Sequence, residues 1–185
     1  MSTKYKATAN GEAYFVTITT VGWIDVFTRL NQKYILINAL KYCQKERGLE
    51  IYGYCIMSSH MHLLCKASEK ETLSIVMRDF KKFTSKEIVE TIIEYPESRR
   101  EWMLAYFNEV CSHLKRKQLY KVWQNGYHAE HVYSNNFIKQ KLDYIHQNPV
   151  VEKIVSNPED YVFSSARNYA ELDNELEVIR LEVFY

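Results

Sequence analysis

Short runs of β-branched and aromatic residues alternate along the chain with longer segments in which hydrophobic residues recur every three or four positions. Residues 14–20 (YFVTITT), 50–57 (EIYGYCIM) and 61–66 (MHLLCK) are of the first kind and predict strands. Only three residues separate the last two runs, which is typical of a tight hairpin. Residues 122–133 also look extended, so the chain is expected to form about four strands.

The longer segments predict helices. One helix is expected to begin with Asn31 as its cap and to end near Arg47, because Gly48 follows as a stop. A second helix is expected over 70–94, where the hydrophobic positions are helically spaced until Pro96 interrupts them.

Two further helices are expected in the second half of the chain. The third covers 98–117. The last begins after a cap at Ser134, runs to about Gln147 and is ended by Pro149. Residues 158–170 look irregular, with a short helical end. The residues expected on the buried face of the third helix are Trp102, Ala105, Tyr106 and Val110.

The order strand, helix, strand, strand, helix, helix, strand, helix predicts an α+β fold of the ferredoxin-like plait class. In that fold an antiparallel sheet of about four strands has helices packed on one face. With 185 residues, the chain fits a single domain over residues 1–185. Its core is expected over about 14–170, and residues 171–185, with five acids and one Arg, form an acidic C-terminal tail.

Charge is distributed unevenly, although the net charge is only +1. Residues 78–86 carry four Lys/Arg and one Asp, and residues 113–121 carry four Lys/Arg and no acid. Two interpretations are open: solvated helix faces, or contacts to the phosphates of a nucleic acid.

Nothing in the sequence indicates a membrane or secreted protein. The N-terminal MSTKYKATANG lacks the apolar region of a signal peptide, and no apolar run approaches the roughly 18 residues that span a bilayer. The four cysteines include no CxxC pair. We therefore expect a cytoplasmic protein with reduced, buried thiols and no membrane partner.

The first group of residues that suggests chemistry is His60-Met61-His62 at the start of a predicted strand. Residues two apart in a strand point to the same face, so the two imidazoles should project together while Met61 points toward the core. Two imidazoles on a rigid sheet form half of a divalent-metal site. A pair of surface histidines without a metal would give the same pattern.

The second group is Tyr144 with Asn148, four residues apart and therefore on one face of the last helix. A Tyr hydroxyl can attack a phosphodiester and form a phosphotyrosine, which conserves the energy of the broken bond for religation. Phenols are protonated at neutral pH, so the proton must be taken or the reaction otherwise assisted. Asn148 could offer an amide oxygen to a metal. Structural roles in a chain with fifteen Tyr are the alternative.

Three other histidines lie near these groups. His146 follows Tyr144 by two residues and should face away from it. His128 and His131 come just before the last helix, where they could contact phosphate or assist proton transfer, or be structural.

Taken together, the stretches IYGYCIMSSHMHLL, WQNGYH, LDYIHQNPV and PEDYVFSSARNYA resemble single-tyrosine HUH transposases, and are most similar to the REP-associated tyrosine transposases. The resemblance runs from about Tyr14 to Ala170. It implies that His60 and His62 are metal ligands, that Tyr144 is the nucleophile and that Asn148 is a third ligand. Insertion-sequence relatives often have Gln at the last position.

The resemblance further implies a metal-dependent single-strand DNA endonuclease and strand transferase. Tyr144 would attack single-stranded or hairpin DNA in the presence of Mg²⁺ or Mn²⁺, without ATP, and form a 5′-phosphotyrosine and a free 3′-OH. A homodimer is possible, since some relatives exchange the Tyr helix. The residues expected to contact DNA are Lys81, Lys82, Lys115, Arg116, Lys117 and His128.

Two other functions remain open. A domesticated hairpin DNA-binding protein would need no catalysis, and a metal-dependent phosphodiesterase would use water in place of Tyr144. This chain also has SSHMH where many relatives have a Pro-Asn turn. Its residues 94–120 look longer than in the smallest relatives, with no role assigned.

Overall fold

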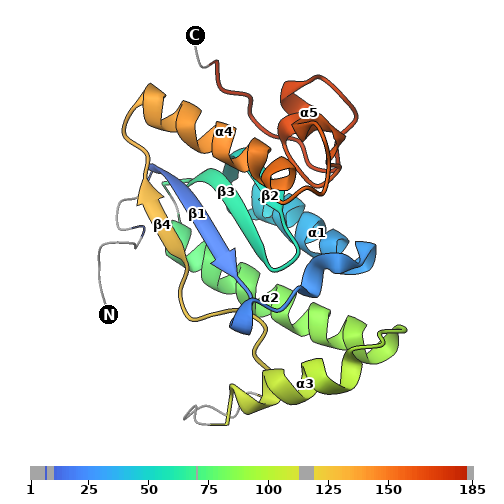
Figure 1. Cartoon of the computed structure of the whole chain (residues 1–185). Coiled ribbons are helices and arrows are strands. Elements are labelled where there is room, and N and C mark those ends of the chain that lie inside the picture. The colour runs from blue at the N-terminus through green and yellow to red at the C-terminus, as the bar shows by residue number, and fades with distance from the viewer. Residues whose placement is uncertain (1–6, 8–10, 70, 113–118, 183–185) are drawn as a thin grey trace.

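The structure of the chain is a computed structural model that describes residue 7 and residues 11–69, 71–112 and 119–182 (Figure 1). Three short 3₁₀ segments (η1, Val21–Trp23; η2, Val26–Thr28; η3, Pro158–Asp160) accompany the main elements. The main elements, in chain order, are β1 (Ala13–Thr19), α1 (Leu30–Arg47), β2 (Leu49–Ile56), β3 (His60–Ala67), α2 (Leu73–Glu94), α3 (Arg100–Glu109), β4 (His128–His131), α4 (Asn135–Val151) and α5 (Ala166–Tyr169).

The four strands form one antiparallel sheet in the order β2-β3-β1-β4. Together with α1 and α2, this order confirms the predicted plait. Both of these helices lie on one side of the sheet, as expected, whereas α4 lies on the other side (Figure 1). A Cβ built on Gly53 of β2 would lie 2.7 Å from the side chain of Leu142, so α4 packs directly against the strands.

The sheet face toward α1 and α2 is the centre of the core. Strand alternation places every second side chain on this face, where it is removed from water. Those on β1 and β3 include Val16, Ile18, Met61, Leu63 and Cys65, all with an exposed fraction of 1% or less. The four cysteines are all buried and unpaired, as expected.

The third helix differs from its prediction. It buries Met103 and Phe107, while Trp102 and Ala105 face solvent. Both sets of residues have helical spacing, and the larger pair Met103 and Phe107, one turn apart, takes the core-facing side. The described helix ends at Glu109; residues 113–118 of the predicted element lie outside the described residues.

The last helix passes through Pro149 and ends at Val151, so the prediction that Pro149 ends it was wrong. Ser134 caps the helix as expected, because its side chain accepts a hydrogen bond from the backbone N–H of Phe137. A proline removes one backbone donor, but the helix resumes beyond it: the N–H of Glu152 donates to the carbonyl of Asn148 at 3.0 Å. Residues after Pro149 therefore keep the helical phase of Tyr144.

The C-terminal segment covers the exposed edge of β2. The N–H of Ile56 donates to the carbonyl of Phe163 at 3.0 Å, and the N–H of Ser165 to the carbonyl of Tyr54 at 2.9 Å. Covering an edge strand removes a site of unwanted strand pairing. In the described part of the chain, no helix is long and apolar enough to cross a bilayer.

A buried carboxylate joins the start of α3 to the loop before α1. Glu97 accepts hydrogen bonds from Arg29 at 2.9 Å and Arg99 at 3.1 Å. Burial alone would raise the pKa of Glu97, but the bonds from Arg99 and Arg29 outweigh it and lower the pKa to about 2. The stabilisation is therefore present above the usual pKa near 4.5 and is lost as the pH falls toward 2.

We expect Glu97→Gln to lower the free energy of unfolding by about 2 kcal/mol at neutral pH, because a charge-assisted interaction is lost. The difference from wild type should shrink as the pH is lowered below the usual carboxyl pKa. Urea unfolding at several pH values measures it. Glu94→Gln, an exposed neighbour at the end of α2, is the matched control; an equal effect there would refute the assignment.

Candidate active site

The paired histidines open β3, where the register with β1 fixes their direction. His60 pairs with Thr19 and His62 with Thr17. Both imidazoles project from the sheet face that also carries Phe15 and Thr17, which we call the histidine face. Their ring centroids are 4.8 Å apart. The two-residue spacing thus places both rings together, as expected from a strand.

His62 occupies an unusual environment for a histidine. It is 3% exposed, stacks on Phe15 with centroids 5.4 Å apart, and places its Nδ1 2.9 Å from the hydroxyl of Thr17. Burial, together with the neighbouring His60 and Lys141, lowers its pKa to about 3. The ring is therefore neutral at physiological pH. With Nδ1 as donor to Thr17, Nε2 presents a lone pair, and this buried atom has no hydrogen-bond partner among the described residues.

His60 lies nearer to solvent. Its Nδ1 is 3.2 Å from the hydroxyl of Ser59, and its ring meets the edge of Trp23 at a centroid distance of 5.6 Å. Burial lowers its pKa, against an opposing effect of Glu152. Both imidazoles are thus available as neutral ligands at neutral pH.

Tyr144 on α4 meets the histidine face from above. Its ring centroid is 5.1 Å from that of His62 and 5.8 Å from that of Phe15. About half of the side chain (49%) stays exposed, so a substrate can reach it. The structure therefore brings the predicted nucleophile next to the two predicted histidine ligands within one chain.

Asn148 follows Tyr144 by one turn on the same face of α4, and Glu152, the residue just after the helix, follows by two turns' spacing. Asn148 is half-buried, and its side-chain amide makes no hydrogen bond within the described residues. Glu152 is close enough to His60 to act on its pKa. From Tyr144, these residues therefore run toward the end of the sheet that carries His60.

The donor set fits a divalent metal ion. A buried nitrogen without a partner, such as Nε2 of His62, costs about 1–3 kcal/mol unless something binds it. Two neutral imidazoles and a free amide oxygen are ligands that Mn²⁺ accepts readily and Mg²⁺ can share with water. Within the described residues, no three His, Cys, Asp or Glu side chains come together as a metal site, here or elsewhere, so the two histidines would need a ligand of another kind, such as the Asn148 amide or water.

Sequence reasoning missed three residues that build the site. Phe15 and Thr17 fix the His62 ring, and their only signal was alternation along β1. Lys141 lies one turn before Tyr144 and holds its ammonium 4.4 Å from the Phe15 ring and 3.0 Å from the carboxylate of Glu130. Its spacing from Tyr144 could have indicated it.

The remaining histidines differ in which side of the sheet or helix they occupy. His128 pairs with Thr17 across β4 and β1, so it lies on the histidine face, where its Nε2 is 3.2 Å from Glu130. His131 pairs with Tyr14 on the opposite face. His146 faces away from Tyr144, as predicted, and bonds Ser165 at 2.9 Å.

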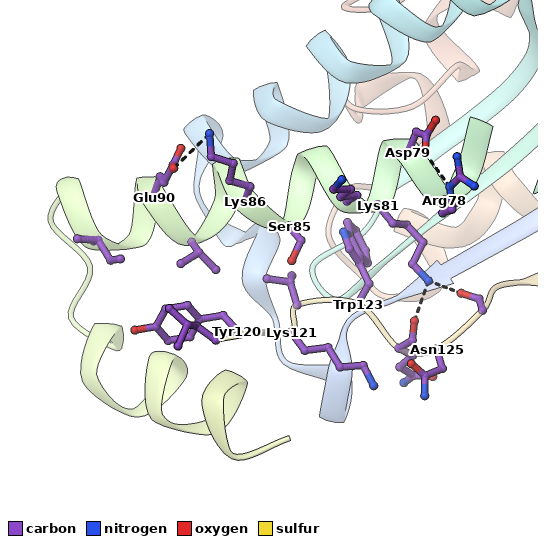
Figure 2. Close-up of a pocket in the computed structure, with 17 residues that line it drawn as sticks. Arg78, Asp79, Lys81, Ser85, Lys86, Glu90, Tyr120, Lys121, Trp123 and Asn125 are labelled. Carbon is purple, nitrogen blue, oxygen red and sulfur yellow. Dashed lines mark hydrogen bonds and ion pairs between the residues drawn. The ribbon is translucent and has the colours of Figure 1, made fainter. Parts of the chain in front are cut away.

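A basic groove lies between α2 and residues 119–126 (Figure 2). It has a volume of about 1020 Å³. Its charged lining residues are Arg78, Lys81, Lys82, Lys86 and Lys121, against Asp79 and Glu90. We call it the α2 groove.

Of the predicted DNA contacts, Lys81 and Lys82 line the α2 groove. Lys82 and Lys121 form no ion pair within the described residues. Lys81 donates to the carbonyls of Gln124 and Gly126, and its burial lowers its pKa to about 8. Trp123, which also lines the groove, is buried and cannot stack on bases. The predicted contacts Lys115, Arg116 and Lys117 lie outside the described residues.

The sequence of this chain was compared with those of known protein families. Residues 24–116, just over half of the chain, match the family described as IS200-like transposases. The chain belongs to the IS200-like transposase family. The matched residues include His60 and His62 and end before Tyr144.

One solved structure shares the fold of this IS200-like transposase. A REP-associated tyrosine transposase bound to a REP hairpin is similar with a TM-score of 0.65 and 20% identity, over 100% of this chain and 98% of that one. A candidate transposase from Deinococcus radiodurans gives 0.45 and 15%, over 78% of this chain and 98% of that one. The comparison with curated proteins gave no match.

Proposed function

We propose that this IS200-like transposase is a metal-dependent single-strand DNA endonuclease and strand transferase with Tyr144 as its nucleophile. The observation that carries the proposal is the position of the Tyr144 ring, 5.1 Å from the ring of His62, whose buried Nε2 has no hydrogen-bond partner among the described residues. A phenol that is exposed on one side, next to an imidazole nitrogen available to a metal ion, is suited to attack a phosphate held there. Family membership supports a transposase chemistry.

In the proposed reaction, the phenolic oxygen of Tyr144 attacks the scissile phosphorus. The P–O3′ bond breaks, the 5′ end stays on the enzyme as a phosphotyrosine, and the departing 3′ oxygen takes up a proton as a free 3′-OH. The phenolic proton passes to water or to a base in the site. No bond energy is lost, so the 3′-OH of another strand can reverse the step.

The chain's own residues would orient this reaction. His60, His62 and Asn148 would hold Mg²⁺ or Mn²⁺, and when bound the ion supplies a Lewis acid that neutralises charge on the phosphate. Thr17 fixes the His62 ring through its 2.9 Å bond to Nδ1. Lys141 adds positive charge one turn from the nucleophile.

Single-stranded or hairpin DNA is the proposed partner. The similar REP-associated transposase is bound to a REP hairpin. In this chain Gln124 lines the α2 groove and also contacts the end of β1: its N–H donates to the carbonyl of Thr19 at 2.9 Å and its side chain to the carbonyl of Thr20 at 3.1 Å. Thr19 pairs with His60, so a strand that lies in the groove would lead to the histidine face.

Charge reversal in the α2 groove tests this path. We expect Lys82→Glu with Lys121→Glu to weaken binding of an oligothymidylate and to reduce the slope of log affinity against log salt by about 0.7 per lost phosphate contact. Fluorescence anisotropy at several salt concentrations measures both. Lys45→Glu on α1, also exposed, should leave the slope unchanged; if it changes the slope equally, the groove has no special role.

The reaction itself is tested by trapping. The protein is incubated with Mn²⁺ and a pool of DNA hairpins that carry randomised single-stranded extensions, then run on a denaturing gel. A covalent protein–DNA adduct supports the proposal. Cleavage without an adduct under single-turnover conditions would identify a water-using phosphodiesterase. Binding without cleavage in any divalent metal would identify a non-catalytic hairpin-binding protein.

A further inference from the structure

Trp23 is an exposed tryptophan beside the candidate site. Its side chain is 61% exposed, and its ring meets the His60 ring edge-on at a centroid distance of 5.6 Å. Its backbone has φ of +56°, a left-handed conformation that bulky residues rarely adopt. Neither the exposure of an apolar ring nor this conformation helps the chain to fold.

The loop that carries Trp23, residues 20–27, is nevertheless held firmly. Thr20 donates from its N–H and its hydroxyl to the carbonyl of Ser59, both at 2.9 Å, and Phe27 donates to the carbonyl of Ser58 at 2.8 Å. These acceptors form the turn immediately before His60. The loop and the first imidazole therefore keep a fixed relative position.

Gly22 contributes to this fixed position. It has φ of +60°, and a Cβ there would lie 2.5 Å from the Tyr106 hydroxyl, so the loop packs closely against α3. The close approach leaves the next residue, Trp23, directed outward. Backbone strain that the surrounding structure imposes in this way is typical of functional sites.

We propose that Trp23 is a stacking platform for a DNA base next to the scissile phosphate. This inference rests on the proposed function and names a substrate-positioning residue for it. A phosphate held between Tyr144 and the histidine pair places its flanking bases within reach of an aromatic side chain that contacts His60. Every base has a π-face, so the contact would be sequence-tolerant.

Binding is measured in a Tyr144→Phe background, which removes the covalent step. Trp23→Leu, which keeps an apolar side chain without an aromatic face, should weaken binding of an oligothymidylate by roughly 5- to 150-fold. Trp23→Phe should retain most of the affinity. Tyr42→Ala, a similarly exposed aromatic on α1, should change nothing. Thermal unfolding of each variant is measured in parallel.

The outcomes separate the inference from the function it rests on. Weaker binding by Trp23→Leu, with unchanged or higher thermal stability and rescue by Phe, supports the platform. Equal binding by Leu and wild type overturns it, while adduct formation would still support the proposed function. A change in oligomeric state with Trp23→Leu, seen by sedimentation, would assign the ring to a protein interface and also overturn it. Wild-type protein that neither binds nor forms an adduct overturns both.

Discussion

Tyr144→Phe should abolish the covalent protein–DNA adduct and reduce strand cleavage by on the order of 10⁴-fold or more. The substitution removes only the hydroxyl oxygen, which is the atom proposed to bond to phosphorus. No other described tyrosine makes a ring contact with His60 or His62. Denaturing gels with Mn²⁺ and the hairpin pool, run for both proteins at matched concentrations, give the comparison.

The phenyl ring left behind makes the test specific. It keeps the contacts with Phe15 and His62, so the free energy of unfolding should change by less than about 0.5 kcal/mol. DNA affinity should likewise stay within about twofold, since no contact to the strand other than the nucleophile is lost. Tyr42→Phe is the matched control and should leave adduct formation intact. An adduct with the Tyr144→Phe protein would move the nucleophile elsewhere.

The residues of this site differ in how well the sequence could predict them. The His60-x-His62 spacing on a strand and the helical phase of Tyr144 and Asn148 follow from the periods of 2 and 3.6 residues. Those periods do not depend on tertiary contacts. The same periods also predict the order of strands and helices, and that order is compatible with few topologies, so the plait was predictable as well.

What the sequence left open depends on contacts between distant segments. The partner of His62 is Thr17, 45 positions away, and only the strand register brings them together. The position of Trp23 depends on a loop held by the turn before His60, which no local pattern encodes. The buried side of α3 was mispredicted because hydrophobic residues lie at helical spacing on two sides of this helix. Packing against the rest of the fold buries the side with Met103 and Phe107.

The histidine pair and Tyr144 come from different elements, a strand and a helix. The imidazoles sit on the central part of a sheet whose other face is the core, so they cannot shift without disturbing buried side chains. Tyr144 comes from α4, which is not part of the plait and packs on the histidine face of the sheet. In the proposed site, two ligands from the sheet would be joined by Tyr144 and Asn148 from a separately packed helix, and the phosphate would be bound between the two elements.

The largest effect expected at the sheet comes from His62→Leu. Cleavage should fall on the order of 10³-fold, because loss of one imidazole removes the ion's contribution of several kcal/mol. Mn²⁺ at 100 times its dissociation constant should raise the free energy of unfolding of the wild-type protein by about 2.7 kcal/mol, which raises its unfolding temperature. Mn²⁺ should not change the unfolding temperature of the variant. His131→Leu, on the opposite face, should keep the response.

The metal-free stability of His62→Leu supplies a second, independent readout. The pKa of His62 is lowered to about 3 by burial, so its unfolded state binds a proton that the folded state excludes. Metal-free wild type should therefore lose up to roughly 4 kcal/mol from this group as the pH falls from about 6.5 toward 3, and the variant should not. Near neutral pH, removal of the unpartnered Nε2 should offset the lost Thr17 bond, which leaves the variant about as stable as wild type. A variant that unfolds at neutral pH would instead show that the imidazole is needed for the fold.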